Sequence, residues 1–128
     1  MQSLDELLSE ARSGLTRVAP GELADASRLG ALIVDIRDSS DRATEGVIPG
    51  SVHIPRSVLE WRLAPSSEWR SHDLTADSLV VLVCSEGFSS TLAAVNLQRL
   101  GLSGATDLIG GYRAWTATNS LASDEAVA

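Results

Sequence analysis

The single cysteine of the chain, Cys84, stands where an apolar run gives way to a short polar loop. The run 80–83 is apolar, and all its residues except Leu82 are β-branched, which is typical of a buried parallel strand. After the loop, residues 90–100 repeat apolar side chains at helical spacing. The sequence therefore predicts the order strand, cysteine, loop, helix, with the loop formed by Ser85, Glu86, Gly87, Phe88 and Ser89.

A cysteine in that position can be a nucleophile. The first N–H groups of a helix have no intrahelical partners, and with the helix dipole they favour an anion such as a thiolate. Successive N–H groups of the loop can converge on the sulfur, with Gly87 supplying a conformation that other residues avoid. These features favour the thiolate of Cys84. The alternative is a buried structural cysteine at the end of a core strand, because free cysteine is often buried.

Composition narrows the classes of protein. At 128 residues, with 44% hydrophobic residues, residues 1–128 are expected to form one domain. The net charge of −7 argues against nucleic-acid binding, and no apolar run predicts a membrane span or a signal peptide, so we expect a cytoplasmic protein. One cysteine excludes an internal disulfide, and two distant histidines, His53 and His72, do not indicate a metal site. No cofactor is expected.

Periodicity predicts an α/β domain. Strands are expected near residues 16–18, 31–36, 51–54, 80–84 and 105–109, and helices near 3–14, 20–29, 39–46, 55–63, 90–100 and 112–115. A flexible acidic tail is expected from about residue 119 to residue 128. Such alternation implies a parallel sheet with helices on both faces and a ligand site beyond the carboxyl ends of the strands. Cys84 and the segment 35–38, which contains Arg37, both follow such ends.

Four ordered pieces of sequence together resemble the rhodanese-like (sulfurtransferase) family. The pieces are residues 32–37, 46–55, 83–89 and 110–115, and the segments 56–62 and 84–90 resemble single-domain members of actinobacteria. The resemblance implies a five-stranded parallel sheet flanked by helices on both faces. It also implies that Cys84 carries sulfane sulfur as a persulfide, taken from a small donor such as thiosulfate and passed to a thiol or cyanide.

The loop departs from the family pattern in its charges. Many relatives hold a basic residue directly after the cysteine or an arginine five positions on, where this chain has Ser85 and Ser89, with acidic Glu86 between them. A carboxylate at the mouth should repel the thiosulfate dianion. Compensating cations could come from Arg37, Arg56 and Arg62. Trp61 is expected near the mouth of the pocket, where it could touch the substrate. For Arg37, internal pairing with a nearby aspartate is the favoured interpretation.

Two further functions compete with the enzyme hypothesis. Cys84 could serve a sulfur-relay or binding module of low turnover that works with a protein donor or acceptor, and Glu86 keeps this alternative open. A phosphatase of the related dual-specificity type would need a loop one residue longer with an arginine that binds phosphate bidentately, so we do not favour it. His53 is expected to pack and to form hydrogen bonds rather than act as a base.

Overall fold

The computed structural model describes the backbone of residues 1–127 and the side chains through residue 119. The α-helices are α1 (Leu4–Ser13), α2 (Leu23–Arg28), α3 (Ser39–Glu45), α4 (Leu59–Leu63), α5 (Ser89–Arg99) and α6 (Gly111–Val127). Two short 3₁₀ helices are η1 (Pro20–Glu22) and η2 (Arg56–Val58). The strands are β1 (Leu32–Asp35), β2 (Val52–His53), β3 (Val80–Val83) and β4 (Ala105–Asp107).

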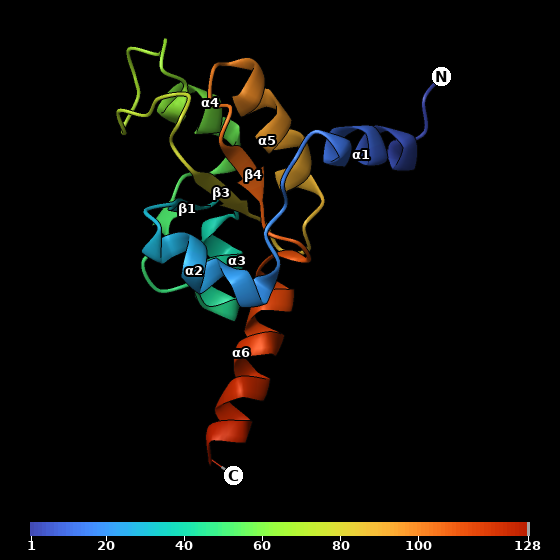
Figure 1. Cartoon of the computed structure of the whole chain (residues 1–128), viewed down its shortest axis with the longest axis vertical. Helices are drawn as coiled ribbons and strands as arrows, with labels where there is room; N and C mark the ends of the chain where they lie inside the picture. The colour runs from blue at the N-terminus through green and yellow to red at the C-terminus, as the bar shows by residue number, and fades with distance from the viewer. Residues whose placement is uncertain (128) are drawn as a thin grey trace.

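The strands form one parallel sheet in the order β2-β1-β3-β4 (Figure 1). The expected α/β class and parallel sheet are confirmed, but the expected count of five strands is wrong for the described chain. Val18 makes only an isolated bridge to Leu108, donating its N–H to Asp107 O at 3.0 Å and accepting from Ile109 N–H at 2.8 Å. Pro20 follows, begins η1 and has no N–H to donate, so the pairing does not extend into a fifth strand.

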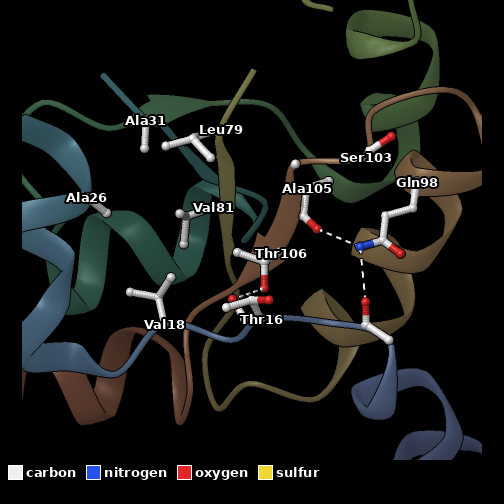
Figure 2. Close-up of a pocket in the computed structure, with 12 residues that line it drawn as sticks. Thr16, Val18, Ala26, Ala31, Leu79, Val81, Gln98, Ser103, Ala105 and Thr106 are labelled. Carbon is white, nitrogen blue, oxygen red and sulfur yellow. Dashed lines mark hydrogen bonds between the residues drawn. The ribbon is translucent and has the colours of Figure 1, made fainter. Parts of the chain in front are cut away.

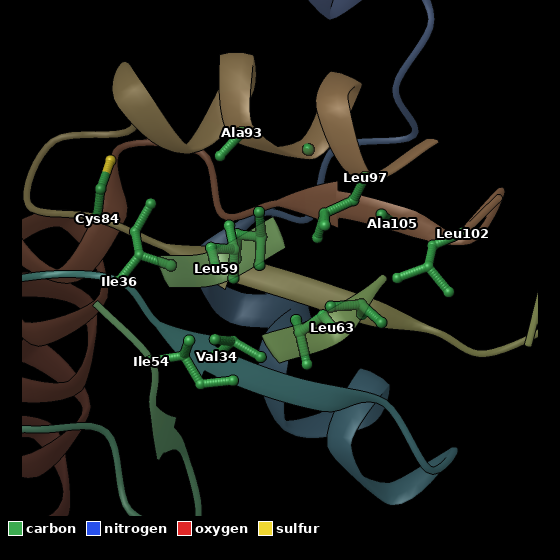
Figure 3. Packing of buried hydrophobic residues seen from close by; sticks show 13 residues of the cluster. Val34, Ile36, Ile54, Leu59, Leu63, Cys84, Ala93, Leu97, Leu102 and Ala105 are labelled. Atoms are coloured by element: carbon green, nitrogen blue, oxygen red, sulfur yellow. The ribbon is translucent and has the colours of Figure 1, made fainter. Parts of the chain in front are cut away.

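Alternation along β3 divides the core into two layers. Val80 and Leu82 pack with residues of α4 and α5, whereas Val81 and Val83 pack with residues of α2 and α6. Helices therefore cover both faces of the sheet, as expected. Because side chains alternate with a period of two, Cys84 falls on the face of Val80 and Leu82. Figure 3 shows it at the end of that cluster, beside the loop that leads into α5.

The two ends of the chain lie on different sides of the sheet (Figure 1). Helix α1 begins with the expected capping box, in which Ser3 Oγ accepts from the Glu6 N–H and the Glu6 carboxylate accepts from the Ser3 N–H. Helix α6 is much longer than the expected 112–115 and includes the backbone of the segment from about 119, whose flexibility stays a prediction. None of the described helices is long and apolar enough to cross a membrane.

Candidate active site

Cys84 directly follows β3, and the loop after it turns sharply at Gly87 before entering α5. Gly87 has a φ of 82°, in the left-handed region that residues with a side chain rarely adopt. A Cβ there would also lie 2.7 Å from the Gly110 nitrogen. In this conformation the Gly87 N–H donates to the Cys84 Sγ at 3.1 Å. The loop therefore presents a backbone donor to the sulfur, as the sequence predicted.

The start of α6, which follows β4, binds the backbone of this loop. The Tyr112 N–H donates to Cys84 O at 2.8 Å, and the Arg113 N–H donates to Ser85 O at 3.1 Å. Gly111 approaches so closely that a Cβ on it would meet Cys84 O at 2.4 Å. The Gly-Gly turn is thus required for α6 to fix the first two residues after β3.

The Cys84 thiol is 6% exposed and lies close to the first turn of α5. Its Sγ donates to Ser90 Oγ at 3.2 Å while accepting from the Gly87 N–H. Burial works to raise the pKa of Cys84, but hydrogen bonds with Ser90, Ser89 and the Gly87 N–H outweigh it and hold this pKa below its ordinary value. The environment therefore favours a thiolate more than an exposed site would.

An open pocket of about 370 Å³ leads to the sulfur. It is lined by Ile36, Arg37, Asp41, Cys84, Ser85, Glu86, Phe88, Ser89 and Arg113. Four of the five predicted loop residues line it, and the fifth, Gly87, supplies the N–H to Cys84. The ends of β1 and β3 meet here, as expected for a parallel sheet.

Arg113 is a cation of this pocket that sequence reasoning missed. Its Nη1 donates to the Glu86 carboxylate, and its Nε donates to Glu45 Oε1 at 3.1 Å. The side chains of Arg113 and Glu86 are each 53% exposed, so water screens their pairing. Glu86 is therefore not an isolated negative charge at the mouth. The sequence did contain an indication of its position, because Arg113 lies in the family-like segment 110–115, two residues after the Gly110–Gly111 turn.

Arg37 is paired internally, which confirms the favoured interpretation. Its Nε and Nη2 donate to the two carboxylate oxygens of Asp35 at 3.0 and 2.8 Å, and Nη2 also donates to Gly46 O at 2.7 Å. The guanidinium lies 4.0 Å from the Tyr112 ring centroid. Arg37 also lines the pocket. Its Nε and Nη2 are already bound, whereas its Nη1 is buried and has no hydrogen-bond partner among the described groups.

The other predicted residues lie elsewhere. Arg56 Nη1 pairs with Glu60 Oε1 at 2.8 Å, and Arg62 Nη1 donates to Trp69 O at 2.9 Å. Trp61 is 58% exposed and lines a separate pocket that it shares with Trp69. None of the three lines the pocket of Cys84, and an anion-binding role for them stays a prediction.

His53 is a hydrogen-bonding residue of the fold. Its Nε2 lies 2.7 Å from Arg37 O, which ties β2 to the segment after β1. His72 is partly exposed and contacts Ser71 Oγ through its Nδ1 at 2.9 Å. Among the described side chains, no three histidine, cysteine or acidic residues gather in a way that could hold a metal ion.

A buried polar cluster lies behind the loop, and sequence reasoning did not find it. Asp107, at the end of β4, is 0% exposed and accepts from Ser90 Oγ at 2.7 Å and Thr91 Oγ1 at 2.9 Å. Arg17 pairs with Asp107 through its Nε at 2.8 Å. Arg17 and Arg12 also donate to Gly87 O at 3.2 and 3.0 Å. An acidic residue inside a predicted core strand was the available signal.

A second pocket, of about 400 Å³, lies near the opposite ends of β3 and β4 (Figure 2). Gln98 Nε2 donates to Ala105 O at 3.0 Å there, and Thr106 Oγ1 donates to Thr16 O at 2.9 Å. Its described lining includes no cysteine, no histidine and no charged side chain, in contrast to the pocket of Cys84.

Comparison with known proteins agrees with this geometry. The fold and the loop-held cysteine define a single-domain α/β protein with a cysteine directly after a parallel strand. Residues 19–118 match the family described as "Rhodanese-like domain", and the chain belongs to this family. The recognition made from the sequence is confirmed.

Individual relatives are similar over most of their length. The chain is 35% identical over 107 residues to the thiosulfate sulfurtransferase GlpE of Pseudomonas entomophila, covering 83% of this chain and 89% of the relative. A solved structure of the human single-domain sulfurtransferase TSTD1 has a TM-score of 0.65 and 27% identity, covering 79% of this chain and 95% of that one. These relatives support sulfur transfer of the rhodanese type as the activity.

A second similar structure has a different description. It is a Rhodopseudomonas palustris protein of unknown function, described as a possible tyrosine phosphatase. It has a TM-score of 0.82 and 30% identity, covering 93% of this chain and 92% of that one. The phosphatase alternative is therefore best judged on the loop itself.

Proposed function

We propose that Cys84 is the sulfur carrier of a rhodanese-type sulfurtransferase. The observation that supports it most is the Gly87 N–H on the Cys84 Sγ at 3.1 Å, at the base of an open pocket. The Cys84 thiolate attacks the sulfane sulfur of the donor, an S–S bond forms, and the donor's remaining part leaves with the electron pair of the broken bond. With thiosulfate, the leaving group is sulfite.

The second half-reaction regenerates the thiolate. An acceptor thiolate or cyanide attacks the outer sulfur of the persulfide, and the S–S bond breaks with its electron pair returning to Cys84. No general base is needed once the thiolate exists, and the loop N–H groups can stabilise the negative charge in both steps. A small donor and a thiol or cyanide acceptor are the substrates of this scheme. A reducing cytoplasm would keep the lone thiol available.

We assign donor binding at the mouth to Arg113, in place of the arginines predicted from the sequence. Arg113 lines the Cys84 pocket and is held by Glu86 and Glu45. An anionic donor competes with these carboxylates for the guanidinium, and Asp41 adds another negative charge to the lining. Small dianions should therefore bind weakly.

The same charges support a second candidate, a sulfur relay with a protein partner. A partner that brings its own basic group could pair with Glu86 and release Arg113 for the persulfide or its leaving group. The exposure of both side chains, 53% each, leaves them accessible to such a partner. High turnover with small donors would favour the enzyme, and sulfur loading without turnover would favour the relay.

Phosphate-ester hydrolysis is not supported by the loop. Phosphoryl groups are typically held bidentately by an arginine, and residues 85–89 contain none. Arg37 also lines the pocket, but its Nε and Nη2 are bound to Asp35 and Gly46, so only Nη1 is left without a partner among the described groups and a bidentate contact through two nitrogens would break the existing pair. We therefore propose sulfur transfer rather than phosphatase chemistry.

The test is to load the protein with thiosulfate or glutathione persulfide and to measure its intact mass. One sulfur adds about 32 Da, and cyanide or a thiol should remove it. Cys84→Ser should take up none. A matched control, the double variant Cys84→Ser/Ser85→Cys, keeps one cysteine in the loop but moves it off the Gly87 N–H, and it should not turn over. A labile sulfur retained by Cys84→Ser would contradict the assignment.

A further inference from the structure

The sulfur of Cys84 is connected to a fully buried carboxylate through one hydroxyl. Cys84 Sγ donates to Ser90 Oγ at 3.2 Å, and Ser90 Oγ donates to Asp107 Oδ2 at 2.7 Å. Ser90 and Asp107 are both 0% exposed. Water cannot reach either group freely, so the chain's own atoms decide where the hydroxyl proton points.

A hydroxyl carries one proton and can serve one acceptor at a time. While Cys84 is a thiol, its S–H fills a lone pair on Ser90 Oγ, and the Ser90 proton is free to bind Asp107. When Cys84 becomes a thiolate, the sulfur has no proton to donate and needs donors instead. Asp107 does not depend on Ser90 alone, since Thr91 Oγ1 at 2.9 Å and Arg17 Nε at 2.8 Å also donate to it.

We propose that Ser90 is a two-position donor that binds Asp107 while Cys84 is protonated and turns to the Cys84 Sγ when the thiolate forms. Ser90 is then a catalytic residue, because it touches the reacting sulfur, and Asp107 and Arg17 are positioning residues. In this step the S–H bond breaks, its proton passes to a base in solution and its electron pair stays on sulfur. The Ser90 O–H bond only rotates. This inference rests on the proposed role of Cys84.

Asp107 and Arg17 set the balance between the two positions. A lone buried carboxylate behind Ser90 would hold the hydroxyl strongly and would repel a thiolate. Arg17 neutralises that charge, and its Nη2 also donates to Gly87 O at 3.2 Å, beside the N–H that binds the sulfur. The charged groups around Cys84 are Arg12, Arg17 and Asp107 behind the loop and Arg37, Asp41, Glu86 and Arg113 at the mouth.

The test is the pH profile of Cys84 alkylation by iodoacetamide, a neutral reagent. The chain has one cysteine, so the rate reports Cys84 alone. Ser90→Ala should shift the profile to higher pH and slow alkylation at a fixed pH below the midpoint by about tenfold, because the thiolate loses a donor. Asp107→Asn should shift it to lower pH, because the competing charge is gone.

Thr91→Val is the matched control, since it also deletes a buried hydroxyl that donates to Asp107, and that hydroxyl contacts Gly87 O at 3.3 Å but not the sulfur. Its profile should stay close to that of the wild type. Circular dichroism and thermal unfolding should show that each variant is folded. Equal shifts for Ser90→Ala and Thr91→Val would overturn the proposal, because the effect would then act through Asp107.

A shift of Asp107→Asn to higher pH would also overturn it, since Asp107 would then serve only to hold the loop. Alkylation requires no sulfur donor. If the alkylation profiles shift as expected but the protein takes up no sulfur, the donor role of Ser90 is upheld and the sulfur-carrier role of Cys84 is rejected. If the protein takes up sulfur but the profiles do not shift, the sulfur-carrier role is upheld and the donor role of Ser90 is rejected.

Discussion

Replacing Glu86 by Gln removes one negative charge from the mouth of the Cys84 pocket and releases Arg113 from one of its two carboxylate partners. Both changes favour an anionic donor. We therefore expect Glu86→Gln to lower the KM for thiosulfate and Arg113→Ala to raise it. The kcat for the later transfer to cyanide should change less, because neither substitution removes the Gly87 N–H that donates to the Cys84 Sγ.

The magnitude follows from Coulomb's law for a partly exposed charge. If Glu86 lies about 7 Å from a bound dianion, the repulsion in water is about 1.2 kcal/mol, or about sevenfold in KM. Screening at physiological ionic strength reduces this to about 0.5 kcal/mol, or about twofold. The effect of Glu86→Gln should therefore be large in dilute buffer and small in salt.

The assay is steady-state formation of thiocyanate from thiosulfate and cyanide at several salt concentrations. The surface pair of Asp25 and Arg28 on α2 gives a matched control, because Asp25→Asn and Arg28→Ala change the net charge equally, near the amino ends of the strands. Those variants should leave the KM unchanged. The reasoning fails if Glu86→Gln and wild type have the same KM at low salt, or if Asp25→Asn lowers it equally.

Three further predictions concern the loop, the thiol and the buried ion pair. Gly87→Ala should lower the free energy of unfolding by about 1–3 kcal/mol or more, because alanine is strained at this φ, whereas Gly21→Ala, at an open site, should cost little in the same denaturant titration. Hydrogen bonds to Cys84 outweigh its burial and lower its pKa, so the rate of its alkylation should reach half its maximum at a lower pH than for an ordinary cysteine thiol and fall as the pH falls further. Burial works to raise the pKa of Asp35, but Arg37 holds it below the ordinary value, so the pair stabilises the fold above about pH 4 and less as the pH falls through the folded pKa. Asp35→Asn should cost about 3–5 kcal/mol at pH 7, with the difference shrinking in acid.

The fold and the position of the nucleophile were predictable because they depend on local patterns. The unbroken apolar run before Cys84 requires a strand buried on both faces, and the helical spacing after it requires a helix. Those two elements alone place the sulfur at a carboxyl end of the sheet. The expected fifth strand, at residues 16–18, does not form beyond the single bridge of Val18 to Leu108. Pro20 follows it and has no N–H to donate, and this was evident from the sequence.

The partners of the site were less predictable because they come from distant parts of the chain. Arg113 reaches the mouth only because the Gly110–Gly111 turn packs against the cysteine loop, and this approach is a tertiary feature. Asp107 was expected in a strand, but its pairing with Arg17 spans 90 residues. The resemblance of segment 56–62 to the family suggested Arg62 as one possible cation, whereas Arg62 Nη1 donates to Trp69 O.

The arrangement separates two tasks that a basic loop would combine. A cation within the loop would both stabilise the thiolate and attract the donor, whereas here the sulfur is held by Gly87 N–H and Ser90, and the mouth is governed by Arg113 and Glu86. The cations behind the loop, Arg12 and Arg17, precede residue 19, where the family match begins. Substitutions of Arg113 or Glu86 should therefore change which donor is preferred without altering the stability of the thiolate. Substitutions of Arg12 or Arg17 should alter the stability of the thiolate without changing which donor is preferred.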